Sequence, residues 1–151
     1  MPTEIADVLD GLDLFRDFSF PELKTIGKRL QQVHKKPGEV IFKEGDAGDH
    51  MLILVEGKLS IFKGGEHGSH LLCHEGRGRV IGEMALLDNE LRSATCVADT
   101  ECELLILTKE QLQKLSVDAP QVAYRFMFSL AKLLSRRLRR TSGMLVEYLV
   151  N

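Results

Sequence analysis

Short apolar runs separated by glycine-containing turns fill the middle of this 151-residue chain. The runs are Val40–Phe42, Met51–Val55, Leu59–Phe62, Leu71–Cys73, Ala94–Ala98 and Leu104–Leu107. Turn-formers such as Glu56-Gly57 and Gly64-Gly65 stand between them, at points where tight hairpins need a positive φ. Many short strands at this spacing predict an all-β sandwich or barrel and argue against a βαβ sheet.

Helical patterns flank this β region on both sides. Ser19-Phe20-Pro21-Glu22 has the form of a capping box, and apolar residues follow at helical spacing from Leu23 to Leu30. The helical period returns from Lys109 to Leu115 and again from about Ala119 to Leu149. We therefore predict a mainly β, single-domain protein over residues 1–151. Its parts would be N-terminal helices over 1–32, a jelly-roll-like β-roll of about eight strands over 33–108 and C-terminal helices over 109–151.

Composition indicates a soluble globular protein. A hydrophobic content of 44% and a charged content of 28% are ordinary, and a net charge of −2 argues against a strongly basic nucleic-acid binder. Cys73, Cys96 and Cys102 show neither disulfide nor zinc spacing and fit a reducing cytosol. Because the acidic N-terminus lacks a signal-peptide pattern and no apolar run could span a membrane, we expect a cytoplasmic protein without a membrane partner.

The segment at residues 80–95, VIGEMALLDNELRSAT, carries the candidate chemistry. Met84 to Leu87 can form one helical turn whose free N–H groups attract an anion. Arg92 follows, with the Ser93 hydroxyl beside it at the entrance to a predicted strand. A cation, a hydroxyl and a helix N-terminus together predict a phosphate site. Glu83 would then accept a hydrogen bond from another part of the ligand, such as a ribose hydroxyl.

This segment resembles the phosphate-binding cassette of the cyclic-nucleotide-binding domain family, which includes catabolite activators and protein kinase regulatory subunits. The family pattern is Gly-Glu, a short helix, and Arg followed by small residues. The residues that fill this pattern in register are Gly82, Glu83, Arg92, Ser93, Ala94 and Thr95. The segment from Pro37 to Phe62 is similar to the family's first hairpins, and the resemblance extends over about Leu14 to Leu138.

The resemblance implies a cyclic-nucleotide sensor, with cAMP as the expected ligand and cGMP as the alternative. Glu83 would hold the ribose 2′-hydroxyl and Arg92 the cyclic phosphate. Further contacts are expected from Gly82, Met84, Ala85, Ser93 and Ala94. Leu91 stands where many members have Pro, and some members bind no nucleotide. The alternative function is therefore an orphan domain that serves as a dimerisation or protein-interaction module.

The last predicted helix carries a heptad spacing of apolar residues. This heptad seam consists of Met127, Ala131, Leu134, Leu138, Thr141, Leu145 and Tyr148. Such a seam suits a partner helix, so we expect a homodimer through it, with packing onto the roll as the alternative. The segment at residues 135–142 resembles the helix of bacterial catabolite activators, in which a Thr-Ser pair contacts the adenine amino group across the dimer. Thr141 and Ser142 thereby become candidates for base recognition, or a polar break that fixes helix register.

A basic segment and the position of the C-terminus bear on further partners. Arg136, Arg137, Arg139 and Arg140 predict a solvated face that could also meet nucleic acid or an acidic partner. The sequence ends at Asn151, before any helix-turn-helix module, so direct DNA binding is not expected. We expect the ligand to signal to a downstream protein, still unknown, by repositioning the C-terminal helix.

An enzyme is the rival class. His67, His70 and His74 cluster with Cys73 and Glu75 in one predicted hairpin, and β-rolls of the cupin type place metal ligands on strands, although in a His-x-His pattern followed by Glu. The first two histidines lie on either side of a Gly-Ser turn, so their side chains are not expected to bind the same metal ion. No metal site is therefore expected. The sequence shows no arrangement of Ser, His and Asp, of Cys and His, or of paired carboxylates typical of catalysis, and we do not expect an enzyme.

Overall fold

The computed structural model describes residues 4–65, 68–88 and 91–150, without the side chains of 65 and 144–150. The chain divides into two compact units. The helical unit contains both ends of the chain, up to Ile26 and from Leu115 onwards, and the β unit contains Gly27–Lys114. Among the described residues, no helix combines the length and the apolar character needed to cross a membrane.

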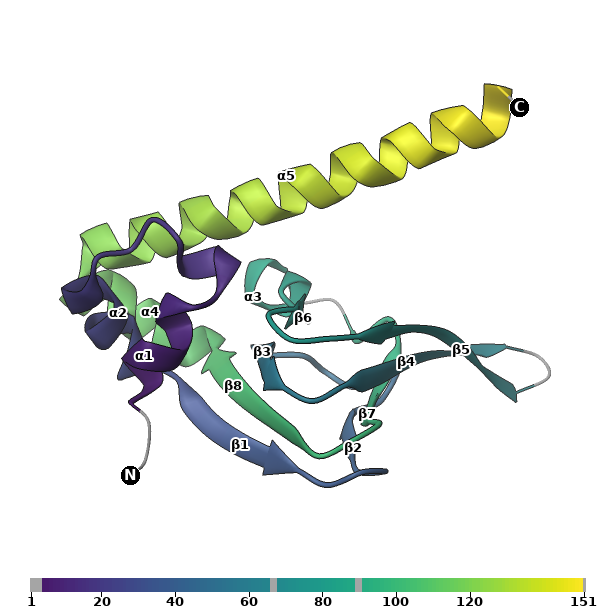
Figure 1. Cartoon of the computed structure of the whole chain (residues 1–151), viewed down its shortest axis with the longest axis horizontal. Coiled ribbons are helices and arrows are strands. Elements are labelled where there is room, and N and C mark those ends of the chain that lie inside the picture. Colours follow the sequence, from purple (N-terminus) through teal and green to yellow (C-terminus); the bar gives the residue numbers. More distant parts are fainter. Residues whose placement is uncertain (1–3, 66–67, 89–90, 151) are drawn as a thin grey trace. The chain divides into compact units, whose positions relative to one another are not determined.

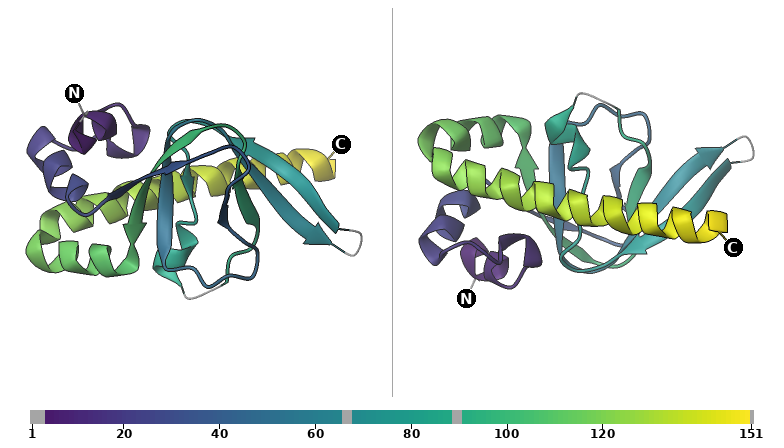
Figure 2. Two further views of the ribbon diagram at one scale, coloured as in Figure 1. Left: turned by 90° about the horizontal axis from the view of Figure 1, so that it is seen from below. Right: turned by 90° about the horizontal axis from the view of Figure 1, so that it is seen from above.

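Within the described residues, the β unit contains eight strands in two antiparallel sheets (Figure 1). The strands are β1 Gln31–Lys35, β2 Val40–Phe42, β3 His50–Glu56, β4 Leu59–Gly65, β5 Gly68–Glu75, β6 Val80–Ile81, β7 Thr95–Ala98 and β8 Cys102–Thr108. One sheet has the order β1-β8-β3-β6 and the other the order β2-β7-β4-β5. Figure 2 shows the strands wrapped into a roll from which β4 and β5 extend as a hairpin. The predicted mainly β, jelly-roll-like architecture is confirmed.

The core of the roll consists of apolar side chains from both sheets. Its fully buried members are Leu54, Leu59, Cys96, Ala98, Cys102 and Leu104. The central strand β3 is buried along four consecutive residues, Met51 to Leu54, which explains why its sequence is a continuous apolar run without alternation. At the β3–β4 turn, Gly57 has φ +104°, and a Cβ there would collide with the Glu101 carbonyl, so this predicted turn requires glycine.

Two strands lie outside the apolar runs of the sequence. β1 begins at Gln31, two residues before the predicted start of the roll, and is mostly exposed and polar. It forms because every one of its residues pairs with β8, so tertiary pairing outweighs its weak strand propensity. β6 contains only Val80 and Ile81, paired with β3, and is too short for a periodic signal.

The helical unit holds the predicted N-terminal helices and the C-terminal helix. Its elements, together with the start of α4 in the β unit, are α1 Ile5–Asp10, the 3₁₀ helix η1 Asp13–Phe15, α2 Phe20–Gly27, α4 Lys109–Asp118 and α5 Pro120–Val150. The capping box of α2 is confirmed, since the Glu22 N–H donates to Ser19 Oγ at 3.3 Å and the Ser19 N–H donates to Glu22 Oε1 at 2.9 Å. The Ser19 N–H lowers the pKa of the Glu22 carboxyl.

One face of α5 is buried in the helical unit. It carries Val122, Ala123, Phe126 and Leu130. The Phe126 ring stacks on Phe15 with ring centroids 6.2 Å apart, and Phe18 meets Phe15 edge-on. The described members of the heptad seam lie on a different face. Met127 and Leu134 are half-buried, Ala131, Leu138 and Thr141 are exposed, and the side chains of Leu145 and Tyr148 lie outside the described part of the chain.

Candidate functional site

The site begins at the end of β6, where the chain turns sharply into a four-residue helix. Gly82 has φ +75°, and a Cβ at this position would collide with the Arg92 guanidinium. The helix α3 follows at Met84–Leu87, as the sequence predicted. Of the predicted contact residues in this turn, Glu83 and Ala85 are buried and Met84 is exposed.

Arg92 is the centre of the site, and only 6% of its surface is exposed. Its Nη2 donates to the His50 carbonyl at 2.7 Å, and its Nη1 donates to the Gly82 carbonyl at 3.4 Å. The guanidinium lies over the Phe42 ring at 4.4 Å from the centroid. Its Nε is buried and donates to no acceptor among the described residues.

A buried guanidinium without a full set of acceptors is energetically unfavourable. Burial lowers the pKa of Arg92, while the Asp49 and Asp46 carboxylates act in the opposite direction. Asp49 also accepts a hydrogen bond from the His50 ring at 2.8 Å, which lowers the pKa of that carboxyl. An anion beside Nε would provide the acceptor that this side chain lacks.

The backbone around Arg92 is fixed by the loop after β2. The Arg92 N–H donates to the Asp46 carbonyl at 2.8 Å, and the Gly45 N–H donates to the Arg92 carbonyl at 2.8 Å. Leu91 forms an isolated bridge with Ala47 and is 61% exposed. Leu91 therefore keeps the chain beside this loop in extended pairing although it replaces the proline of many family members.

Gly48 in the same loop lies directly against the site. A Cβ at Gly48 would be 2.9 Å from both Ala85 Cβ and Arg92 Nε, closer than real Cβ contacts allow. The loop, α3 and the guanidinium are therefore packed without room for one more methyl group. Sequence reasoning placed Gly48 in a hairpin and missed this contact, and it also missed His50 and Phe42. Their contacts with Arg92 use a backbone carbonyl and a ring face, which leave no pattern in the sequence.

Comparison with protein families gives a match to the cyclic nucleotide-binding domain over residues 32–118 of this chain. The match spans more than half of the chain, and it includes Arg92, Glu83 and the loop that packs against them. The chain belongs to the cyclic nucleotide-binding domain family. The predicted family membership is thereby confirmed.

Relatives of this cyclic nucleotide-binding domain include regulators of transcription. It is 26% identical over 142 residues to the CRP-like cAMP-activated global transcriptional regulator of Mycobacterium tuberculosis, covering 93% of this chain and 62% of the relative. It is 35% identical over 134 residues to the Cyclic AMP receptor protein of Thermus thermophilus, covering 87% of this chain and 59% of the relative. The chain thus spans about three-fifths of the length of these two relatives.

Solved structures support the same family. A cyclic nucleotide-binding domain from Methylobacillus flagellatus superposes with a TM-score of 0.81 at 28% identity, covering 95% of this chain and 81% of the other. The catabolite activator protein of Thermus thermophilus superposes with a TM-score of 0.74 at 34% identity, covering 87% of this chain and 61% of the other. The relatives named here are regulatory and binding proteins by their names.

A polar network supports the strand that follows Arg92 in this cyclic nucleotide-binding domain. Thr95 Oγ1 accepts from the Glu44 N–H at 2.9 Å, and Lys63 Nζ donates to the Ser93 carbonyl at 2.7 Å. Glu44 joins the two, because its carboxylate accepts from the Gly64 N–H at 2.9 Å and pairs with Lys63 at 3.1 Å. The Gly64 N–H and then Lys63 lower the pKa of the Glu44 carboxyl.

The remaining predicted contact residues are distributed over both units. Ser93 is exposed and Ala94 is half-buried, next to Arg92 in the β unit. Thr141 and Ser142 are exposed on α5 of the helical unit, where Thr141 Oγ1 donates to the Arg137 carbonyl at 3.0 Å. The structure therefore brings the cassette residues together, and the ligand contacts expected of them, like those of Thr141 and Ser142, stay predictions.

The histidine-containing hairpin shows no metal-ligand geometry among the residues that the structure describes. No three His, Cys, Asp or Glu side chains gather there or elsewhere in that part of the chain, and His67 lies outside it. The His74 ring is hydrogen-bonded to Ser60 Oγ at 3.1 Å, and Cys73 Sγ is 3.5 Å from a Glu75 carboxylate oxygen.

Proposed function

We propose that this domain binds a cyclic nucleotide, with cAMP as its native ligand, and acts as a regulatory sensor. The observation that carries the proposal is the buried Arg92 Nε, which has no acceptor among the described residues. A cyclic phosphate carries the charge and the oxygen atoms that such a donor requires. The preference for cAMP is supported by the names of the two relatives, one a cAMP-activated regulator and the other a Cyclic AMP receptor protein.

Glu83 is proposed to accept a hydrogen bond from the ribose 2′-hydroxyl. It is buried one residue before α3, so it can face the sugar while Arg92 faces the phosphate. Separation of the two roles prevents direct repulsion between the carboxylate and the phosphate. Gly82, Ser93, Ala94 and the backbone N–H groups of Met84 and Ala85 would complete the contacts with the ligand.

The proposed output is a change in the position of α5. Thr141 and Ser142 would meet the base, so that the ligand favours one position of the helix. The ligand can shift this equilibrium only by its difference in affinity for the two positions. We further propose a cytoplasmic homodimer through the heptad seam, in which Leu138 is 67% exposed. Sedimentation velocity of a Leu138→Glu variant tests the dimer, which should dissociate.

The role of Glu83 can be tested with two ligands that differ only in the ribose 2′-hydroxyl and with one variant. Isothermal titration of the wild type should give weaker binding of 2′-deoxy-cAMP than of cAMP, by about ten-fold for one lost hydrogen bond to a charged group. A Glu83→Gln variant should bind both ligands with nearly equal affinity, because the carboxylate that distinguishes them is gone. An undiminished preference for cAMP in this variant would refute the role of Glu83.

Parallel titration with cGMP identifies the native ligand. We expect cAMP to bind more tightly, and the reverse order would assign the sensor to cGMP. The absence of heat with either nucleotide, in protein shown by circular dichroism to be folded, would reject nucleotide binding and leave the interaction module as the function.

A further inference from the structure

A bend in the cassette separates Arg92 from the strand that follows it. An isolated bridge at Leu91 precedes the bend, and β7 begins after it at Thr95. The bend itself consists of Ser93 and Ala94. Its backbone angles set how the Arg92 side chain and the Ser93 hydroxyl stand relative to β7. Contacts with the backbone of this bend therefore bear directly on the proposed phosphate site.

The register of the sheet places Lys63 beside this bend. Strand β4 pairs with β7, and the pair nearest the bend is Phe62 with Thr95. Lys63 is the next residue of β4, and its Nζ donates to the Ser93 carbonyl at 2.7 Å. Backbone carbonyls need a hydrogen-bond donor, and in a sheet the neighbouring strand supplies it. At the bend, a lysine side chain supplies the donor instead.

Glu44 holds the Lys63 ammonium at this place. One carboxylate oxygen of Glu44 lies 3.1 Å from Lys63 Nζ, and the other accepts from the Gly64 N–H at 2.9 Å. A Cβ at Gly64 would be 3.0 Å from Glu44 Oε2, so the carboxylate lies directly against the backbone of β4. A lysine side chain is flexible, and its ammonium takes a fixed position only where acceptors surround it. Here the two acceptors are the Glu44 carboxylate and the Ser93 carbonyl.

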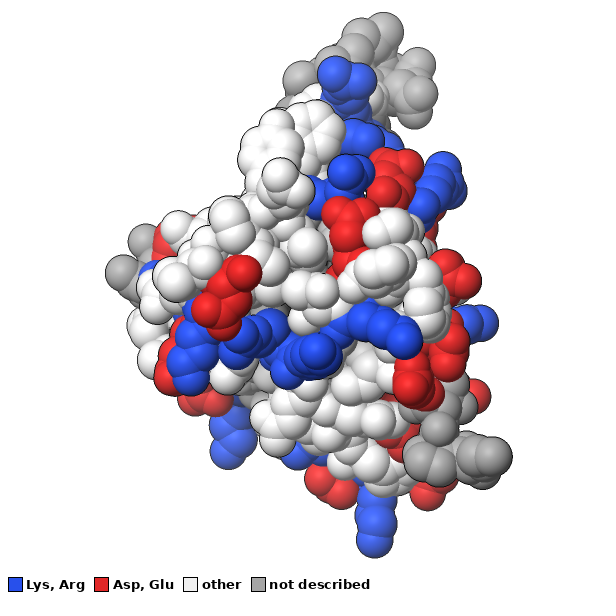
Figure 3. All heavy atoms as spheres, turned by 90° about the vertical axis from the view of Figure 1, so that its left-hand side faces the viewer, with Lys and Arg blue, Asp and Glu red and all other residues white. Residues whose placement is uncertain are grey.

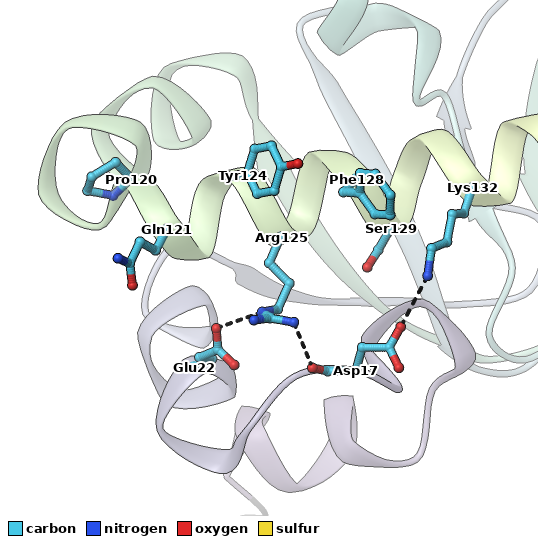
Figure 4. Close-up of a pocket in the computed structure, with 9 residues that line it drawn as sticks. All are labelled: Asp17, Glu22, Pro120, Gln121, Tyr124, Arg125, Phe128, Ser129 and Lys132. Atoms are coloured by element: carbon cyan, nitrogen blue, oxygen red, sulfur yellow. Dashed lines mark hydrogen bonds and ion pairs between the residues drawn. The ribbon is translucent and has the colours of Figure 1, made fainter.

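An exposed ion pair by itself indicates no function. Figure 3 shows basic and acidic atoms close together, next to uncharged surface, on one side of the molecule. Figure 4 shows one such pair in an open groove of the helical unit, where Lys132 Nζ lies 3.4 Å from the Asp17 carboxylate. Water screens such pairs, so they contribute little to stability. Lys63 differs from Lys132 because its second acceptor belongs to the residue next to Arg92.

We propose that Lys63 and Glu44 are positioning residues for the phosphate site. Lys63 fixes the bend that presents the Arg92 guanidinium and the Ser93 hydroxyl, and Glu44 keeps the Lys63 ammonium on that bend. The two residues act through the cassette and do not themselves bind the ligand. This assignment rests on the proposed function, because the effect that it predicts is a change in affinity for a cyclic phosphate.

Direct attraction between the Lys63 charge and the phosphate makes the opposite prediction for Glu44. Removing the carboxylate would leave the lysine charge without its neutralising partner, so direct attraction would raise the affinity for an anionic ligand. Positioning predicts a lower affinity, because the ammonium loses one of its two acceptors. Glu44→Ala keeps the backbone N–H that donates to Thr95 Oγ1, so the sign of its effect distinguishes the two roles.

Isothermal titration of the full chain with cAMP tests the proposal. Lys63→Met keeps an unbranched apolar chain but removes the ammonium, and it should weaken binding by about three- to ten-fold. Lys63→Arg, which keeps the charge and the donor, should bind within about two-fold of the wild type. Glu44→Ala should also weaken binding, and adding it to Lys63→Met should change the affinity by less than about two-fold, because Glu44 acts through Lys63. Thermal unfolding midpoints should fall by less than about 4 °C, which separates lost affinity from lost folding.

Lys58→Met is the matched control. The Lys58 side chain is 47% exposed, against 49% for Lys63, and its Nζ lies 3.8 Å from the Asp99 carboxylate. Asp99 follows β7 at the end opposite to the cassette. Lys58→Met therefore removes a similar lysine and a similar ion pair from the same unit, and it should bind cAMP as the wild type does.

Hydrogen–deuterium exchange of the nucleotide-free protein tests the positioning without a ligand. Residues 91–95 should exchange faster in Lys63→Met than in the wild type or in Lys58→Met. Equal exchange in all three proteins would overturn the proposal, as would tighter cAMP binding by Glu44→Ala or an equal loss of affinity in Lys63→Met and Lys58→Met. A folded wild type that binds neither cAMP nor cGMP would instead reject the proposed function, and with it the effect on affinity, whatever the exchange shows.

Discussion

Adding one methyl group at Gly48 should weaken nucleotide binding while the fold persists. In Gly48→Ala the new Cβ would stand 2.9 Å from Ala85 Cβ and Arg92 Nε, whereas carbon atoms in contact prefer about 3.5–4.0 Å. Ala85 is fixed by α3, and the guanidinium is held against the Phe42 ring, so neither can move away freely. We therefore expect Arg92 to shift by about 0.5–1 Å, as much as the whole range of hydrogen-bond lengths.

The size of the effect follows from the bond that this shift removes. A hydrogen bond to a charged group contributes about 1.5–3 kcal/mol, which corresponds to a loss of about 10- to 150-fold in affinity for cAMP. The effect on stability is smaller, because overpacking of about 1–3 kcal/mol is partly offset by the reduced entropy of the unfolded chain, about 0.4–1 kcal/mol. Isothermal titration and thermal unfolding of Gly48→Ala measure the two quantities separately.

Gly76→Ala is the matched control. A Cβ at Gly76 meets nothing within 4 Å, and the residue does not have a positive φ. This variant should bind cAMP as the wild type does. The steric reasoning fails if Gly48→Ala binds cAMP within about two-fold of the wild type, or if both alanine variants lose affinity equally.

Three further predictions concern the fold. Leu54→Ala leaves a cavity at a fully buried position in the roll and should lower the free energy of unfolding, measured with urea, by about 2–5 kcal/mol. A decrease of less than about 1 kcal/mol would contradict the assignment of Leu54 to the core. The Glu103 carboxylate raises the pKa of His34 above 6.5, so this pair stabilises the fold below pH 6.5 and loses its effect as the pH rises through the raised pKa. Unfolding midpoints of wild type and His34→Gln should therefore differ at about pH 6 and converge at about pH 9, and a constant difference would refute the pairing. Burial raises the pKa of Cys96 to about 12, so peptide mass spectrometry after alkylation of the native protein should find Cys73 modified and Cys96 intact, and early modification of Cys96 would contradict its burial.

Local signals in the sequence were sufficient where neighbouring residues decide the structure. The capping box at Ser19 and Glu22, the glycine turn after β3 and the single turn of α3 were predicted because their hydrogen bonds or backbone angles lie within a few residues. Glu83 and Arg92 could be proposed as ligand contacts because the family's cassette is contiguous in sequence, and the structure buries both side chains.

Long-range contacts could not be predicted in this way. The acceptor of Arg92 is a backbone carbonyl at His50, 42 residues away in the chain, and any residue type could supply it. Strand β1 forms through pairing with β8, since its own sequence is polar. On α5 the sequence shows apolar residues on more than one face, and only the structure shows that Phe126 and Leu130 face the helical unit while Leu138 stays exposed.

The most direct test of the central proposal is isothermal titration of the wild type and of Arg92→Ala with cAMP, each checked by circular dichroism. The check is needed because Arg92 also bonds to the carbonyls of His50 and Gly82. We predict micromolar or tighter binding by the wild type and a loss of at least about ten-fold in folded Arg92→Ala. A folded wild type that releases no heat with cAMP, or a variant that binds as tightly as the wild type, would contradict the assignment of Arg92 as the phosphate ligand.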